Sequence, residues 1–137
     1  MTTSPLLFQH SLQQIAADDP NITKLCLDGY GIGDDGAEAL AKVIQCNTHL
    51  QKLYLQQNQI TPLGAAALAE ALEENQTIDY IDLSYNKLGK SKGIDEFWDV
   101  LTNNKELKKF VMSSDKFVVC FKSKQLRRHH GGARAHY

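Results

Sequence analysis

The sequence repeats itself with a period of 28 residues, and this period constrains the fold more than any other feature. The clearest unit runs from Leu50 to Thr77, and a shift of 28 residues in either direction brings similar residues into the same positions. Leu25, Leu53 and Ile81, for example, share one column. Each unit has an extended first half and a helical second half. Such recurrence predicts a stack of similar units that bury their apolar faces against one another.

Within one unit, local signals indicate where the strand and the helix lie. The alternating Leu53 and Leu55 suit a short strand with one buried face. Thr61 followed by Pro62 is typical of a helix start, and Gly64 would let that helix lie close to the neighbouring unit. The columns predict strands near residues 24–28, 52–56, 80–84 and 109–113.

Two columns of asparagines close the turns of the units. Asn58 and Asn86 follow successive strands, where a turn leaves backbone amides and carbonyls unpaired. Because an amide side chain both donates and accepts, we interpret these two residues as structural. Tyr30 stands in the same column of the first unit, so that turn must be satisfied differently. Asn47 and its equivalents Asn75 and Asn104 end the three units.

The pattern L-x-x-L-x-L-x-x-N-x-[IL], followed by G-x-x-x-L-x-x-x-[LI], resembles the leucine-rich repeat family. The 28-residue spacing is similar to that of the ribonuclease-inhibitor-like subtype, and the resemblance covers roughly residues 12–112. It implies an α/β solenoid, a short horseshoe arc with parallel strands on the concave face and helices on the convex face. It implies little about function, because such repeats serve many unrelated roles.

We divide the chain into an N-terminal helical cap at 1–21, three repeats at 22–106, a degenerate fourth repeat with a C-terminal cap at 107–121, and a basic, disordered tail at 122–137. In the cap, Phe8, Leu12, Ile15 and Ala16 fall on one helical stripe. Residues 117–121 form an apolar run rich in strand formers. We predict that this run folds back as an antiparallel strand over the open sheet edge; a short helix with Leu126 is the alternative.

Composition excludes several classes of function. The sequence has no apolar run of about 18 residues and no recognisable secretory signal, so we expect neither a membrane span nor secretion. Cys26, Cys46 and Cys120 lack metal or redox spacing, which favours reduced thiols in the cytoplasm. We find no nucleophile–base pair, phosphate loop or set of metal ligands. We therefore expect a monomeric protein that is not an enzyme and needs no cofactor or metal.

Charge is divided unevenly along the chain. Residues 1–106 hold 7 Lys+Arg and 15 Asp+Glu, a net charge of −8, whereas residues 107–137 hold 8 and 1, a net charge of +7. The basic tail contains Lys122, Lys124, Arg127, Arg128 and Arg134. Such a tail can bind nucleic acid or an acidic surface, or it can simply be solvated.

Side chains between the buried leucines of each strand should point to the concave face. Stacking brings them into ladders about 4.8 Å apart. We predict that a protein partner binds these residues: Lys24, Cys26, Asp28, Lys52, Tyr54, Gln56, Tyr80, Asp82, Ser84, Tyr85 and Lys109. Tyrosines among polar groups are favoured at interfaces. The alternative is a solvated sheet face with no partner.

The sequence therefore predicts a non-enzymatic protein–protein interaction module. Three alternatives remain open at this point. The first is a regulator of a small GTPase, a role found among relatives of this subtype. The second is a protein that binds nucleic acid or an acidic surface through its tail. The third is a fragment of a larger leucine-rich repeat receptor, because three full repeats are near the lower limit for a stable solenoid.

Overall fold

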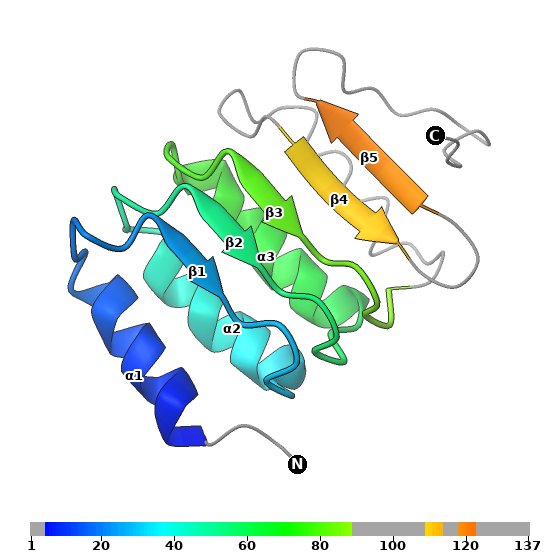
Figure 1. Cartoon of the computed structure of the whole chain (residues 1–137), viewed down its shortest axis with the longest axis horizontal. Coiled ribbons are helices and arrows are strands. Elements are labelled where there is room, and N and C mark those ends of the chain that lie inside the picture. The colour runs from blue at the N-terminus through cyan, green and yellow to red at the C-terminus, as the bar shows by residue number, and fades with distance from the viewer. Residues whose placement is uncertain (1–4, 89–108, 114–117, 123–137) are drawn as a thin grey trace.

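The computed structural model describes residues 5–88, 109–113 and 118–122 of the 137-residue chain. Helices and strands alternate along the first part of the chain, and two strands follow (Figure 1). The elements are α1 (Pro5–Ala16), β1 (Lys24–Cys26), α2 (Gly33–Ile44), β2 (Lys52–Tyr54), α3 (Pro62–Glu74), β3 (Tyr80–Asp82), β4 (Lys109–Ser113) and β5 (Val118–Lys122).

The strands form one sheet in the order β1-β2-β3-β4-β5. The first four pair in parallel, and β5 pairs with β4 in the antiparallel direction. The register of the first pair joins Lys24 to Lys52, and that of the second joins Lys52 to Tyr80, as the 28-residue columns predict. Helices α2 and α3 cover one face of this sheet, and α1 lies beside α2 (Figure 1). The predicted α/β repeat architecture is therefore confirmed.

The core lies between the sheet and the helices. Each strand buries its central residue, and the leucine columns Leu27–Leu55–Leu83 and Ile32–Ile60–Leu88 run through the stack. Leu53 and Leu68 are completely buried, one from a strand and one from a helix. In α1, Ile15 is buried while Phe8 and Leu12 are partly buried against the core. Ala16 is exposed, contrary to the predicted stripe, because it is the last residue of the helix.

Helix α3 begins as the sequence predicts. The Thr61 hydroxyl accepts a hydrogen bond from the backbone N–H of Leu63, and Pro62 occupies the first turn. A Cβ added at Gly64 would lie 2.5 Å from Asp34 Oδ1 and 3.0 Å from Ala37 Cβ, so the glycine permits close packing of α3 on α2. Asp34 itself accepts hydrogen bonds from the Thr61 amide and hydroxyl and from the Gly64 amide, and this bridge was not predicted.

Asparagines join neighbouring units across the turns. Asn58 Nδ2 donates to the Leu27 carbonyl at 2.8 Å, and Asn86 Nδ2 donates to the Leu55 carbonyl at 2.8 Å. These bonds confirm the structural interpretation of both asparagines. They also explain why the strands end two residues before their predicted ends, at 26, 54 and 82. The side-chain amides occupy carbonyls that a longer ladder would have used.

The first turn, where Tyr30 replaces the asparagine, uses glycines instead. Gly29, Gly31 and Gly33 all have φ between 61° and 72°, a region in which a Cβ is unfavourable. This conformation lets the Gly29 amide donate to the Gln56 carbonyl and the Gly33 amide donate to the Asn58 carbonyl. The glycines therefore replace an asparagine side chain with direct backbone contacts to the next repeat.

The end of the sheet also follows the prediction in its main point. Residues 118–122 form an antiparallel strand, β5, which lies along β4 at the edge of the sheet (Figure 1). The boundary is different, because Lys122 is the last residue of β5 and not the first residue of a tail. The reason is its backbone pairing with Lys109, which the polarity of the side chain did not indicate. Asn104 lies outside the described residues.

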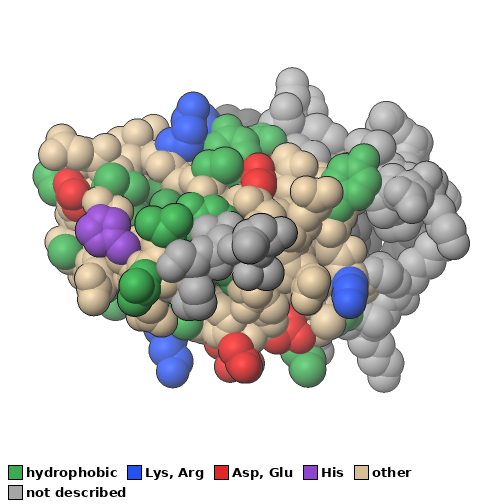
Figure 2. All heavy atoms as spheres, turned by 60° about the horizontal axis from the view of Figure 1, so that its bottom comes forward, with side chains coloured by type: hydrophobic (Ala, Val, Ile, Leu, Met, Phe, Trp, Pro, Cys, Tyr) green, Lys and Arg blue, Asp and Glu red, His purple; other side chains and the backbone are tan. Residues whose placement is uncertain are grey.

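Exposed hydrophobic side chains occur on the helices. Leu7 in α1 is 52% exposed and Leu63 in α3 is 74% exposed. On the face that Figure 2 presents, Lys and Arg side chains are interspersed with acidic and hydrophobic ones. Isolated exposed leucines of this kind are common on protein surfaces and do not by themselves indicate a binding site.

Candidate functional site

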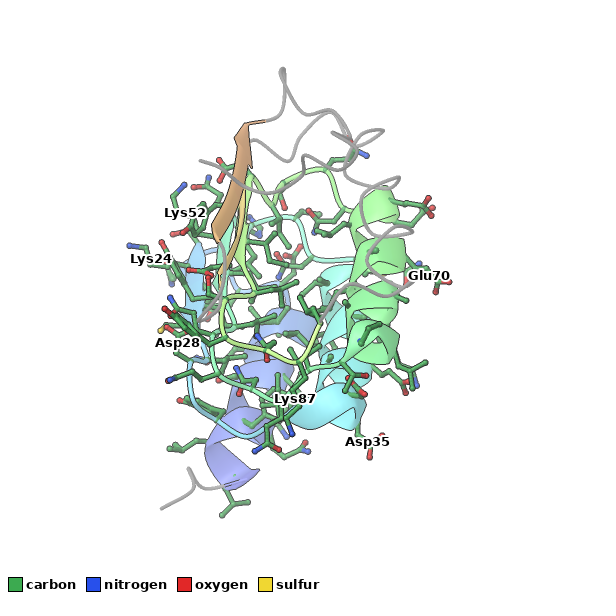
Figure 3. All side chains as sticks on the ribbon, turned by 90° about the vertical axis from the view of Figure 1, so that its right-hand side faces the viewer. Lys24, Asp28, Asp35, Lys52, Glu70 and Lys87 are labelled. Carbon is green, nitrogen blue, oxygen red and sulfur yellow. The ribbon has the colours of Figure 1, made fainter. Side chains whose placement is uncertain are left out.

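The candidate site is the side of the sheet that faces away from the helices, which we call the strand face. Figure 3 shows Lys24, Asp28 and Lys52 on this side of the molecule, and Glu70 on the helix side. Three-residue strands alternate around one buried residue, so the residues before and after it point to the strand face. The repeat period thus brings side chains that are 28 residues apart in sequence into adjacent positions.

Accessibility differs among the predicted site residues. Lys24, Cys26 and Tyr85 are exposed, and Asp28, Lys52, Tyr54, Gln56 and Tyr80 are half-buried. Asp82 and Ser84 are only 5% and 3% exposed, so the expectation that they point openly to a partner is wrong. Lys109 and Lys122 are described through their positions in β4 and β5. Lys124, Arg127, Arg128 and Arg134 lie outside the described residues.

Two tyrosines form the centre of the strand face. The ring centroids of Tyr54 and Tyr80 lie 5.2 Å apart at an angle of 49°. This separation falls within the favourable range for aromatic pairs. Lys52 Nζ lies 5.8 Å from the centroid of the Tyr80 ring and 3.1 Å from Asp79 Oδ1. These contacts restrict the rotamers of the rings, so a partner that binds them loses little side-chain entropy.

The carboxylates of the strand face have internal donors. Asp28 Oδ1 accepts the Gln56 backbone N–H at 2.7 Å, and Cys26 Sγ donates to Asp28 Oδ2 at 3.5 Å. Asp82 accepts from Gln56 Nε2 at 2.9 Å and from the Ser84 amide at 2.9 Å. These hydrogen bonds are the physical reason for the burial of Asp82, because a buried carboxylate needs such donors.

Tyr85 lies at the rim of the strand face with its side chain 49% exposed. Its backbone φ is 57°, an uncommon value for an aromatic residue. Gln57, which precedes it by one period, has the same φ of 57°. The conformation therefore belongs to the turn of the repeat, and the turn presents a large side chain at this position in the third unit.

The described residues contain no group of three or more His, Cys, Asp or Glu side chains that could hold a metal ion. In the same part of the chain, no helix is long and apolar enough to cross a membrane. Cys26 and Cys46 are both exposed free thiols. What the site offers chemically is thus a polar surface with two aromatic rings and several ammonium groups.

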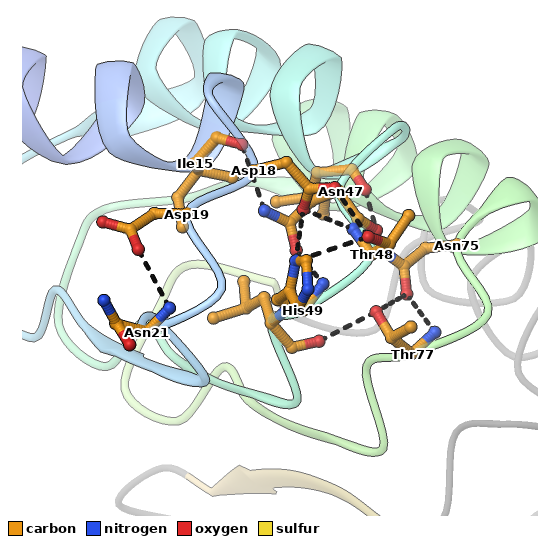
Figure 4. Close-up of polar contacts among 11 residues, drawn as sticks. Ile15, Asp18, Asp19, Asn21, Asn47, Thr48, His49, Asn75 and Thr77 are labelled. Atoms are coloured by element: carbon orange, nitrogen blue, oxygen red, sulfur yellow. Dashed lines mark hydrogen bonds and ion pairs between the residues drawn. The ribbon is translucent and has the colours of Figure 1, made fainter.

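A second polar cluster joins the end of α1 to the loop before β2, and the sequence analysis missed it (Figure 4). Asp18 accepts hydrogen bonds from the Thr48 amide at 2.7 Å and from the Thr48 hydroxyl at 2.6 Å. His49 Nδ1 lies 3.1 Å from Asp18 Oδ1. The hydrogen bond from the Thr48 side chain, then that from its amide, and the neighbouring His49 lower the pKa of Asp18 from 3.8 to about 2.

This pKa shift gives a prediction about acid stability. A carboxylate whose pKa is lower in the folded state stabilises the fold above its unfolded pKa, and this contribution disappears as the pH falls from about 4 towards 2. We expect Asp18→Asn to lower the Tm at pH 7 and to narrow its difference from the wild type as the pH falls through that window. Thermal unfolding followed by circular dichroism measures both.

Asp35→Asn is the matched control for this prediction, because Asp35 is exposed on α2. Its Tm difference from the wild type should change less between pH 5 and pH 2. A Tm difference for Asp18→Asn that stays constant over the same interval would contradict the assigned role of the carboxylate.

The geometry defines the class first: a parallel sheet backed by helices with a 28-residue period is an α/β repeat solenoid. A family model described as Leucine Rich repeat matches residues 19–41 and 46–69. The chain belongs to the leucine-rich repeat family.

Individual relatives match mainly the repeats. The human NACHT, LRR and PYD domains-containing protein 7 is 40% identical over 70 residues, which cover 50% of this chain and 7% of that protein. The human capping protein, Arp2/3 and myosin-I linker protein 3 is 30% identical over 70 residues, 51% of this chain and 5% of that protein. The chain therefore spans less than a tenth of the length of these relatives.

A solved structure described as leiomodin-1 actin-binding site 2 is similar in fold. It superposes with a TM-score of 0.75 and 22% sequence identity, covering 82% of this chain and 65% of that chain. At this identity the likeness shows the fold alone.

Proposed function

We propose that this protein is a non-enzymatic interaction module that binds a protein partner through the strand face. The observation that carries this proposal is the contact between Tyr54 and Tyr80, whose rings are held together on the side of the sheet away from the helices. Their neighbours supply polar groups of both signs at the rim. A partly exposed aromatic centre with a polar surround is the arrangement found in many protein interfaces.

The finer features of the class are also proposals. We infer the ribonuclease-inhibitor-like subtype from the 28-residue period and from the full helix in each of the two described units that contain α2 and α3. The exposed free thiols of Cys26 and Cys46 suit a reducing compartment, which supports a cytoplasmic location.

The test removes both rings. We expect Tyr54→Ala with Tyr80→Ala to weaken partner binding by at least tenfold, since aromatic residues at an interface centre commonly contribute about 2 kcal/mol or more. The intact chain and the variant would be used to capture proteins from a eukaryotic extract. The captured partner would then be titrated against both chains by calorimetry.

A control variant with equal loss of exposed side-chain volume separates binding from general surface effects. Leu7→Ala with Leu63→Ala changes two exposed leucines on the helices and should leave partner binding within about twofold of the wild type. If the tyrosine variant keeps its Tm and binds the partner as tightly as the intact chain, the strand face is not the binding surface.

Cytoskeletal proteins are the first candidate partners to test. This candidate rests on the relative named as a linker of capping protein, Arp2/3 and myosin-I, and on the actin-binding description of the leiomodin-1 structure. Cosedimentation with actin filaments, and pull-down of capping protein and the Arp2/3 complex, would examine each named protein. Recovery of none of them would direct the search to other partners without altering the test of the tyrosines.

A further inference from the structure

Four lysines occupy one row across the sheet. The strand register joins Lys24 to Lys52, Lys52 to Tyr80, Tyr80 to Lys109 and Lys109 to Lys122. We call these positions the lysine row, with Tyr80 at its centre. The sequence columns suggested the first four positions, and the antiparallel pairing of β5 adds Lys122. Residues that are far apart in the chain thus form one basic line over five strands.

The described acidic groups near this row are largely occupied by internal contacts. Asp28 and Asp82 accept the hydrogen bonds from Gln56 that fix the strand face, and Asp82 is buried. Asp79 pairs with Lys52. Because the side chains of that pair are 41% and 28% exposed, solvent weakens it and a partner carboxylate can replace Asp79.

Lys24 has no hydrogen bond or ion pair among the described residues, and its side chain is exposed. The row therefore has more ammonium groups than accessible carboxylates. It lies on a body whose first 106 residues carry a net charge of −8. An acidic partner is repelled by most of that body and attracted to the row, which favours one orientation of binding.

We propose that the lysine row binds an acidic, extended segment of the protein partner, laid across the strands with its apolar or aromatic groups on Tyr54 and Tyr80. This inference rests on the proposed function and adds the chemistry of the partner. Four steps between strands of about 4.8 Å give a row of roughly 19 Å, which about six extended residues would span.

The test uses three labelled 12-residue peptides that alternate threonine with glutamate, glutamine or lysine. Fluorescence anisotropy measures their binding to the full chain at low and physiological salt. We expect the glutamate peptide to bind at least tenfold more tightly than the glutamine peptide, and added salt to weaken its binding. Equal affinity of the two peptides, or no measurable binding of the glutamate peptide, would overturn the inference.

Matched lysine variants locate the binding. Lys24→Gln with Lys52→Gln should weaken the glutamate peptide roughly five- to tenfold, from two partly exposed charge pairs. Lys42→Gln with Lys87→Gln removes the same net charge from exposed side chains outside the row, and should change binding less than twofold. Equal weakening in both variants would overturn the row as the site. Lys109→Gln with Lys122→Gln should weaken binding as the first pair does; unchanged binding would overturn the extension to β5.

Two further outcomes are distinguished. A 12-nucleotide thymidine oligomer that binds more tightly than the glutamate peptide, and depends on Lys24 and Lys52, would overturn the proposal in favour of nucleic acid. If the peptides fail while the tyrosine variant still loses its captured partner, the partner chemistry is wrong and the proposed function stands. If the tyrosine variant loses nothing, the proposed function itself fails.

Discussion

Replacing Leu53 by alanine is expected to lower the free energy of unfolding by about 2–5 kcal/mol, the range for fully buried leucines in well-packed cores. Leu53 is completely buried in β2, between strands β1 and β3 and beneath the helices. Its removal leaves a cavity in the central repeat, where packed neighbours on both sides limit relaxation. Urea unfolding followed by circular dichroism measures the change.

The control is the same substitution at an exposed position. Leu63 is 74% exposed at the start of α3, so Leu63→Ala should change the free energy of unfolding by no more than about 0.5 kcal/mol. Similar losses for the two variants would show that burial in this sheet does not determine the contribution of a leucine.

Replacing Asn58 by alanine is expected to cost about 2–4 kcal/mol, since each buried polar group left without a partner costs about 1–3 kcal/mol. Asn58 is completely buried. Its Nδ2 donates to the carbonyls of Leu27 and Gln56 at 2.8 and 3.2 Å, and its Oδ1 accepts the Ile32 amide at 3.3 Å. Alanine removes all three bonds and is too small to replace them.

The same unfolding experiment provides the comparison. Asn21 is exposed, and Asn21→Ala should leave the free energy of unfolding nearly unchanged. Asn58→Asp retains the acceptor and loses both donors, so it should be at least as destabilising as Asn58→Ala, because a charge is then buried. A stable Asn58→Asp variant would show that the two carbonyls do not need the amide of Asn58.

The parts of the fold that could be predicted from the sequence are those that recur with the period. Leu25, Leu53 and Ile81 are buried in register because each unit must hide the same position against the next one. The antiparallel β5 was predicted for a different reason, the concentration of strand-forming residues beside an open edge.

The contacts that could not be predicted are those that do not recur. Asp34 accepts hydrogen bonds from the start of α3, but the equivalent residue one period later is Pro62. Asp18 binds Thr48, and its own equivalent is Cys46. A column comparison treats such residues as noise, although each makes a specific contact between units.

The candidate site was predicted in position but not in exposure. Asp82 shares a column with Cys26 and Tyr54, which are exposed and half-buried, so the column suggested an accessible side chain. The hydrogen bond from Gln56 Nε2 to Asp82 depends on residues in two different columns. Accessibility on this surface is therefore decided by pairs of side chains, which periodicity alone does not describe.

The asparagine bonds have a consequence for how the molecule opens. Asn58 and Asn86 each bind a carbonyl 31 residues earlier, and Asn75 likewise binds the Ile44 carbonyl. Each bond crosses one boundary between units, so loss of one unit removes partners from the next. In a linear array with such nearest-neighbour coupling, fraying starts at the ends and the interior opens last. The slowest amide exchange should thus mark the middle of the stack, around β2.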